Sequence, residues 1–224
     1  MNLYPTTILA DSPLAYFRLG ELTGTSAADS SGNSNTGAYT GGFSLGRAGA
    51  VAGENDPAAA FDGTGYVASS LTRSSPLSVE AWVNPASFAA VESCILGGIF
   101  TIYTANKFTV GGANNLTTFI VPAGQWSHLA ATWDGTTILA YANGALVATI
   151  TGDTLDYTTG GAGFRIGGRV DVSGNPSYSF IGAIDEVAIY PAVLSATRIL
   201  AHYNAGIVQA AARPVIRPRG ARNA

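Results

Sequence analysis

Cysteine and charged residues are scarce in this chain. Its 224 residues include one cysteine, Cys94, and only 11% are charged. A single cysteine excludes an intrachain disulfide framework and any zinc or iron–sulfur site built from several cysteines. No run reaches the ~18 apolar residues of a membrane-spanning helix, and residues 1–10 lack the basic segment and apolar core of a secretory signal peptide. We therefore expect a soluble protein that does not insert into membranes.

Hydrophobic residues and glycines are abundant instead. The chain is 47% hydrophobic and contains 28 glycines and 10 prolines, which supplies apolar side chains for a core and residues for many turns. All-β sandwiches commonly reach ~250 residues as one unit. We expect one domain over residues 1–206, followed by an extended tail over residues 207–224.

Basic residues concentrate in that tail. The last twelve residues contain Arg213, Arg217, Arg219 and Arg222 and no acid, whereas the preceding part holds the other seven basic residues and all fourteen acidic ones. A mildly acidic body lacks the basic face of a nucleic-acid-binding protein, so we exclude nucleic acid as a partner. A proline-rich basic segment favours extended, solvated chain over packed structure.

Short apolar runs, broken by Gly, Asn, Asp and Ser at intervals of about ten residues, indicate an antiparallel sandwich. In Leu77 to Val83, every second residue is apolar, while Ser78, Glu80 and Trp82 fall on the other face. Asp134-Gly135 and Asn143-Gly144 suit tight hairpin turns between the strands of residues 127–150. Further strands are expected at residues 14–19, 163–166 and 180–190.

One short helix is expected near the C-terminus of the domain. Ser195 is a suitable N-cap, Ile199 and Tyr203 belong to an apolar face, and Gly206 stands where a C-terminal cap glycine is common. The sequence therefore predicts an all-β sandwich with one helix of about ten residues.

Five blocks of sequence carry a family resemblance. In order, they read LAYFRLGELTGTSAADSSGNSNTG, AAAFDGTGYVASS, SVEAWVNP, WSHLAATWDGTTILAYANGALV and FIGAIDEVAIYPAVLSATRILAHYNAG. Residues 13–206 resemble the laminin-G-like, concanavalin-A-like jelly-roll family. The resemblance implies two curved antiparallel sheets packed face to face, with the first and last strands close together.

Related jelly rolls include glycosidases, which need two carboxylates held together. Glu80 stands alone in its strand, and Asp185 and Glu186 are adjacent, so on a regular strand they point to opposite faces. His128 and His202 have no nearby Asp or Cys in sequence, and a nucleophile-elbow motif is missing. We therefore expect no enzymatic activity. The alternative is a carbohydrate-binding module or carbohydrate-active enzyme of a secreted bacterial protein.

A calcium site is the main candidate metal site. On a regular strand Asp185 shares a face with apolar residues and needs a partner, and the loop of residues 29–35 is rich in oxygen ligands. Many laminin-G-like domains bind calcium at such a rim. The resemblance implies Asp29 and Asp185 as carboxylate ligands, with Asn33 or Asn35 as neutral ones. In the alternative, Asp29 forms an Asx turn, Asp185 accepts backbone hydrogen bonds and no metal binds.

The resemblance extends to laminin-G-like minor tail or decoration proteins of bacteriophages. It implies a virion surface or tail protein that contacts host-surface glycans, with an extracellular location as the alternative. The four tail arginines would then dock on other virion proteins. The sequence locates no glycan contact and leaves open whether the protein forms a homo-oligomer.

Overall fold

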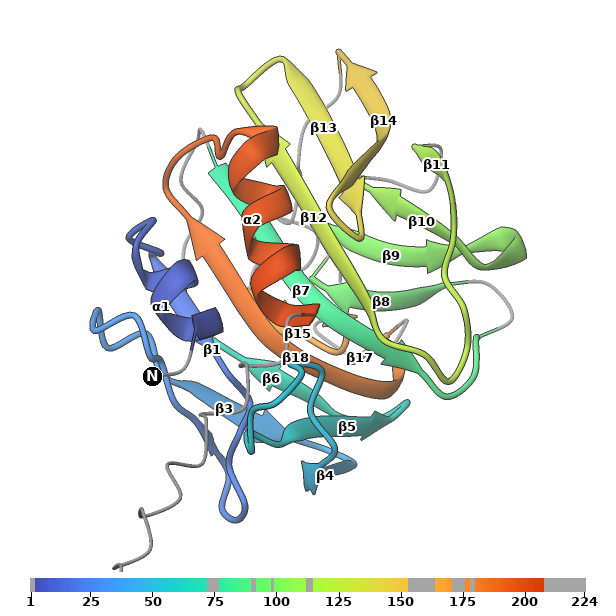
Figure 1. Ribbon diagram of the computed structural model, residues 1–224. Helices are drawn as coiled ribbons and strands as arrows, with labels where there is room; N and C mark the ends of the chain where they lie inside the picture. Colours follow the sequence, from blue (N-terminus) through green and yellow to red (C-terminus); the bar gives the residue numbers. More distant parts are fainter. Residues whose placement is uncertain are drawn as a thin grey trace, which may run out of the picture.

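The computed structural model describes residues 3–71, 77–89, 92–97, 99–111, 115–152, 164–170, 176–177 and 180–207. Within these residues, two eight-stranded antiparallel sheets pack face to face, and two helices lie outside one of them (Figure 1). The core between the sheets is formed by side chains from both inner faces, among them Val79, Phe100 and Ile184. The expected antiparallel sandwich is confirmed, and its architecture is that of a jelly roll.

The first sheet carries the helices on its outer face. Strand β1 (Ala15–Phe17) pairs with β18, off the main path. The main path, in spatial order, is β14 (Ala145–Thr151), β13 (Thr137–Ala142), β12 (Ser127–Trp133), β7 (Leu77–Pro85), β18 (Ile181–Tyr190), β5 (Ala58–Asp62) and β4 (Phe43–Arg47).

The second sheet forms the opposite layer. Strands β16 (Arg169–Val170) and β17 (Pro176–Ser177) form a separate small ribbon, and a 3₁₀ turn, η1 (Thr104–Asn106), joins two strands of the layer. The spatial order is β11 (Leu116–Ile120), β10 (Lys107–Val110), β9 (Phe100–Tyr103), β8 (Ser93–Leu96), β15 (Arg165–Ile166), β6 (Tyr66–Ala68), β3 (Gly37–Thr40) and β2 (Ser26–Ala27).

The meander β12, β13 and β14 has the predicted turns. Gly135 and Gly144 have φ of 102° and 77°, and Asn143 has φ of 51°, the left-handed values that such turns require. Strand β7 also has the predicted faces, because Val79 and Ala81 lie in the core while Trp82 faces outward beneath the helices.

Helix α2 (Ala196–Ile207) lies across the outer face of β7 and β12, as Figure 1 shows. It begins directly after Ser195, whose hydroxyl accepts a hydrogen bond from the Arg198 N–H at 3.3 Å. Gly206 lies inside the helix rather than after its end, so its expected role as a cap is wrong. A Cβ on Gly206 would come within 2.4 Å of Trp82 Cζ2, so close packing is the reason for glycine here.

A second helix, α1 (Leu3–Leu9), precedes the first strand and was not expected from the sequence. Tyr4 and Ile8 are fully buried against the outer face of the first sheet, and the Tyr4 hydroxyl accepts a hydrogen bond from Trp82 Nε1 at 2.9 Å. Helices this short are marginal alone, so packing stabilises α1. Neither described helix is long and apolar enough to cross a membrane.

Strand β18 contains a β-bulge at its two adjacent acids. The register between β18 and β7 shifts between Asp185 and Ala188, and Glu186 has φ of 53°. The extra residue reverses the alternation of faces, because Ile184 before the bulge and Val187 after it both lie in the core. The expectations that Asp185 shares a face with Val187, and that Asp185 and Glu186 point to opposite faces, are therefore wrong.

Candidate functional site

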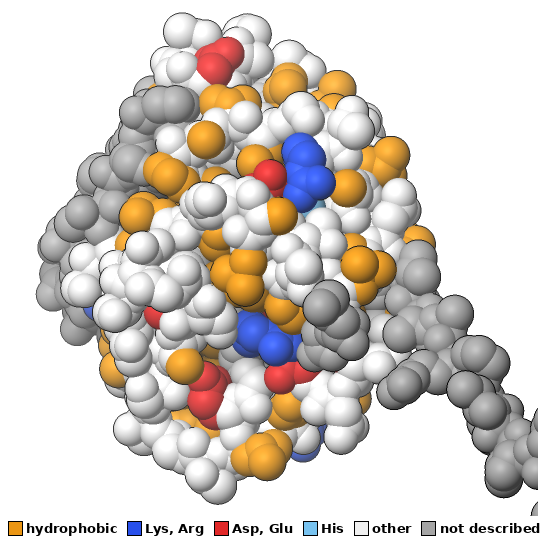
Figure 2. Space-filling model, turned by 60° about the vertical axis from the view of Figure 1, so that its left-hand side comes forward, with side chains coloured by type: hydrophobic (Ala, Val, Ile, Leu, Met, Phe, Trp, Pro, Cys, Tyr) orange, Lys and Arg blue, Asp and Glu red, His pale blue; other side chains and the backbone are white. Residues whose placement is uncertain are grey.

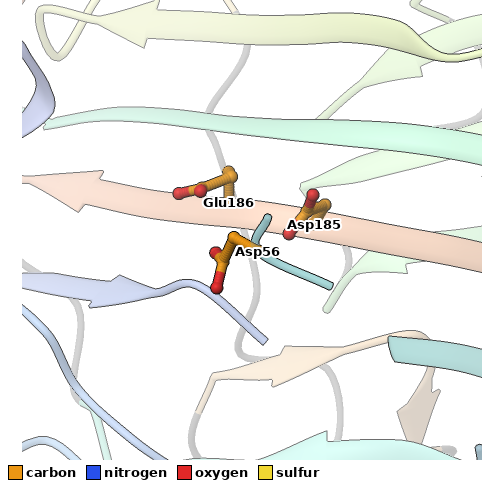
Figure 3. Close-up of side chains that lie close together, drawn as sticks. All are labelled: Asp56, Asp185 and Glu186. Carbon is orange, nitrogen blue, oxygen red and sulfur yellow. The ribbon is translucent and has the colours of Figure 1, made fainter. Parts of the chain in front are cut away.

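The bulge brings three carboxylates together outside the core. Asp185 and Glu186 come from β18, and Asp56 comes from the loop before β5. One ligand atom of each lies within 4.8 Å of the others, and Figure 3 shows Asp56 beside the two β18 side chains. Asp185 and Glu186 are 1% and 0% exposed, while Asp56 is partly exposed. We call these three residues the acidic cluster.

Arg18, which follows β1, partly neutralises this cluster. Its Nη2 lies 2.7 Å from Asp56 Oδ2, 3.2 Å from Glu186 Oε1 and 2.9 Å from Oε2 of the neighbouring Glu54. The Tyr16 hydroxyl also donates a hydrogen bond to Glu186. One guanidinium therefore serves several carboxylates, which leaves an excess of negative charge if all of them are ionised.

Asp185 has one buried oxygen that is not satisfied within the described residues. Its Oδ2 accepts the Ala50 N–H at 2.8 Å, whereas Oδ1 has no hydrogen-bond partner in the part of the chain that the structure describes. Burial raises the pKa of Asp185 to about 8, although the Ala50 hydrogen bond opposes the shift. Burial and the nearby Asp185 charge also raise the pKa of Glu186. Protonation lowers the cost of burying these acids.

A hollow of about 690 Å³ adjoins the cluster, lined by Asp56, Glu54, Asn55 and the Gly46–Gly49 segment. A second hollow of about 380 Å³ shares Arg47 with the first as a lining residue. Figure 2 shows basic and acidic side chains beside one another on the left-hand side of the molecule as drawn in Figure 1.

Three of the four predicted calcium ligands, Asp29, Asn33 and Asn35, do not belong to the acidic cluster. They form hydrogen bonds with the backbone of their own loop and of the chain around β1. Asp29 accepts hydrogen bonds from the backbone N–H groups of Tyr16, Ser31 and Asn35 at 2.8–2.9 Å. The amides of Asn33 and Asn35 donate to the Leu14 carbonyl. These bonds tie residues 29–35 to the start of β1, whereas Asp185 lies with Asp56 and Glu186. Hydrogen bonds to the charged form outweigh burial and lower the pKa of Asp29.

A second group of polar side chains lies buried under α2. Glu80 is fully buried and accepts hydrogen bonds from His128 Nε2 at 2.9 Å, from His202 Nδ1 at 2.9 Å and from the Tyr190 hydroxyl. His202 Nε2 also bonds Asp11 Oδ2 at 2.7 Å. Both ring nitrogens of His202 face carboxylates. Burial alone would lower the pKa of this histidine, but Glu80 and Asp11 raise it, which favours the cation with a proton on each nitrogen. The group joins α2 to the sheet; Glu80, His128 and His202 are fully buried, while Asp11 at its edge is partly exposed.

Sequence reasoning missed Asp56, Glu54 and Arg18 as neighbours of Asp185. The first two lie in a loop without a recognisable motif, and their position follows from the pairing of β5 with β18. The adjacency of Asp185 and Glu186 was visible, but a regular strand would have separated them.

Comparison with known sequences identifies the family. The pattern of one superfamily matches residues 58–200, more than half of the chain. The chain belongs to the concanavalin A-like lectin/glucanases superfamily. No curated protein matches the sequence.

Solved structures with a similar fold agree with this architecture. Domain 4 of AbnA, an extracellular GH43 arabinanase from Geobacillus stearothermophilus, solved in complex with arabinotriose, has a TM-score of 0.62 and 24% identity; the match covers 86% of this chain and 98% of that one. Trypanosoma rangeli sialidase has a TM-score of 0.63 and 16% identity, over 86% of this chain but only 33% of that one. The receptor-binding domain of botulinum neurotoxin type G matches at 0.58 and 13% identity, over 86% and 51%. At these identities the likeness concerns the fold.

Proposed function

We propose that this jelly roll is a carbohydrate-binding domain without catalytic activity. The observation that carries the proposal is the match to nearly the whole of an arabinanase domain whose structure contains arabinotriose. The polar hollow beside Asp56 supports it, because sugar sites combine a concave surface with a few placed polar groups.

The acidic cluster is poorly suited to glycoside hydrolysis. A general acid or nucleophile must touch the substrate, but Asp185 and Glu186 are buried, and Glu186 is held by Tyr16 and Arg18.

We expect calorimetry to detect binding of at least one oligosaccharide, arabinotriose being the first to test, with no hydrolysis above the blank. Turnover abolished by Glu186→Gln would contradict this assignment, and a lack of binding to a broad oligosaccharide panel would contradict carbohydrate recognition.

We also propose a stabilising Ca²⁺ held by Asp185, Asp56 and Glu186. The residues fit such an ion, since hard oxygen ligands are what calcium prefers and the buried Asp185 Oδ1 lacks a hydrogen-bond partner among the described residues. If calcium binds only the folded state, ~100 times Kd should add about 2.7 kcal/mol to the free energy of unfolding. Melting in EDTA and in calcium should show the gain, and Asp56→Asn should remove it. Loss of the gain in Asp29→Asn instead would favour the loop of residues 29–35.

The setting of the domain is a separate proposal. The four tail arginines, which lie outside the described residues, would attach the protein to other virion proteins, so that the domain meets host-surface glycans. Deleting residues 208–224 should then leave the melting temperature unchanged and abolish incorporation into particles, measured by immunoblotting purified virions. Normal incorporation of the truncated chain would contradict attachment by the tail. Absence of the full chain from virions would favour a secreted carbohydrate-active protein.

A further inference from the structure

We infer that the two hollows form one groove, crossed by Arg47, that binds consecutive rings of a neutral oligosaccharide. The inference rests on the proposed carbohydrate-binding function and adds the location, the ligand class and a residue that governs recognition of ligand length.

The geometry of β4 places Arg47 between the hollows. This strand is the edge of its sheet, and its pairing with β5 is irregular between Ser44 and Arg47. Gly46 has φ of 69°, a left-handed value. Beyond this bend, the exposed Arg47 lines both hollows, so a ligand that fills both must pass its guanidinium.

The size of the two hollows favours a ligand longer than one sugar ring. Their volumes are about 690 and 380 Å³, and small-molecule sites commonly measure ~300–1,000 Å³ each. Both are open to solvent, which suits a chain of rings that enters and leaves the groove at its ends. A single ring would leave one hollow empty.

The lining suits hydroxyl groups and a ring face. Asn55 is exposed in the first hollow and offers amide donors and an acceptor. Leu22, at the same hollow, is 74% exposed and provides an apolar surface for the C–H face of a sugar. In the second hollow, Ser44 and Asp62 add a hydroxyl and a carboxylate.

The charges of the lining select against acidic sugars. Glu54 and Asp56 line the first hollow and Asp62 the second, whereas Arg47 is the one base among the described lining residues. Arg18 already pairs with Glu54 and Asp56. Without a bound cation, a uronic or sialic acid would bring a further negative charge next to these carboxylates, at an electrostatic cost.

The test compares ligands by calorimetry in EDTA, using the full chain. A panel of neutral trisaccharides that includes arabinotriose is titrated beside their monosaccharides and the acidic trisaccharide trigalacturonate. We expect a neutral trisaccharide to bind more tightly than its monosaccharide and than trigalacturonate. Arg47→Ala should lower the trisaccharide affinity roughly tenfold and reduce its advantage over the monosaccharide. Asn55→Ala should weaken both ligands.

Lys107→Ala is the matched control, because it removes a positive charge from β10 in the opposite sheet. It should leave every affinity unchanged. If a trisaccharide binds equally to the parent protein, Arg47→Ala and Asn55→Ala, the groove is overturned while carbohydrate binding stands. Tighter binding of trigalacturonate would overturn the ligand class. If no carbohydrate binds, the proposed function fails and this inference fails with it.

Discussion

Replacing Glu80 by alanine should lower the free energy of unfolding by about 3–5 kcal/mol, the usual loss when one partner of a buried ion pair is removed. Glu80 is fully buried and accepts hydrogen bonds from two histidines and Tyr190. Without its carboxylate, the His202 cation loses one of its two acidic partners and remains inaccessible to solvent. The helix α2 that contains His202 should therefore detach more easily from the sheet.

The ionisation of Glu80 and His202 also makes the free energy of unfolding depend on pH. Burial alone would raise the pKa of Glu80, but the charges and hydrogen bonds of His202 and His128 outweigh it and hold the pKa well below its ordinary value. The stability that ionised Glu80 contributes is fully present above about pH 4.3, the ordinary Glu pKa. It is lost as the pH falls through the lower pKa of the folded state. Burial alone would lower the pKa of His202, but Glu80 and Asp11 raise it. That contribution is lost as the pH rises through the raised value.

Urea unfolding at neutral pH measures the effect, and a double-mutant cycle identifies its cause. Glu80→Gln and His202→Asn are made singly and together, since both replacements are uncharged and similar in size. If the pair is coupled as the geometry indicates, the double variant should lose less stability than the sum of the single ones. Strict additivity, or a loss below about 0.5 kcal/mol in Glu80→Ala, typical of a surface change, would contradict this account of the buried group.

In EDTA, stability should fall as the pH rises from about 4 to about 8, and Asp185→Asn should make that slope less steep. The folded pKa of Asp185 is about 8, whereas the unfolded value is close to the ordinary ~3.9. Between these values the folded carboxyl holds a proton that the unfolded one has lost. The stability that protonated Asp185 contributes is therefore fully present below the unfolded pKa and is lost as the pH rises through the folded pKa. The loss is at most about 1.4 kcal/mol per pH unit for one group.

Calcium should oppose this loss. A divalent cation favours the ionised carboxylates, so the slope of the unmodified protein should flatten in saturating calcium. Denaturant midpoints across the pH range, with and without calcium, provide the comparison. His202 and Glu186 contribute a slope of the same sign, and this slope remains in Asp185→Asn. A flat or rising profile in EDTA would show that Asp185 is ionised in the folded protein, and an unchanged slope in Asp185→Asn would place the titration elsewhere.

The sandwich was predictable because its signals are local. The alternation in Leu77 to Val83 and the turns at Asp134-Gly135 and Asn143-Gly144 each depend on a few neighbouring residues, and β7 and the β12 to β14 meander follow them. Helix α2 was found for the same reason. Helix α1 was missed because it depends on the contacts of Tyr4 and Ile8 with distant strands.

The acidic cluster was less predictable because it depends on an irregularity and on pairing. A single extra residue in β18 turns Asp185 and Glu186 to one side, and their sequence alone does not distinguish a bulge from a regular strand. The choice of Asp29 followed its oxygen-rich loop, yet backbone N–H groups of that loop and of β1 already occupy its carboxylate. Gly206 likewise has the composition of a cap, whereas its close approach to Trp82 is a tertiary contact.

Two-dimensional ¹H–¹⁵N NMR, with assigned amides and increasing neutral trisaccharide, tests the central claim most directly. The proposed carbohydrate-binding groove predicts saturable shifts concentrated at Gly46–Gly49 and Asn55–Asp56, with smaller ones at Ser44 and Asp62. The amide signals of β8 to β11 in the opposite sheet should not shift. Shifts confined to that sheet would contradict the groove, and unshifted spectra at saturating concentrations of every oligosaccharide tested would contradict carbohydrate binding itself.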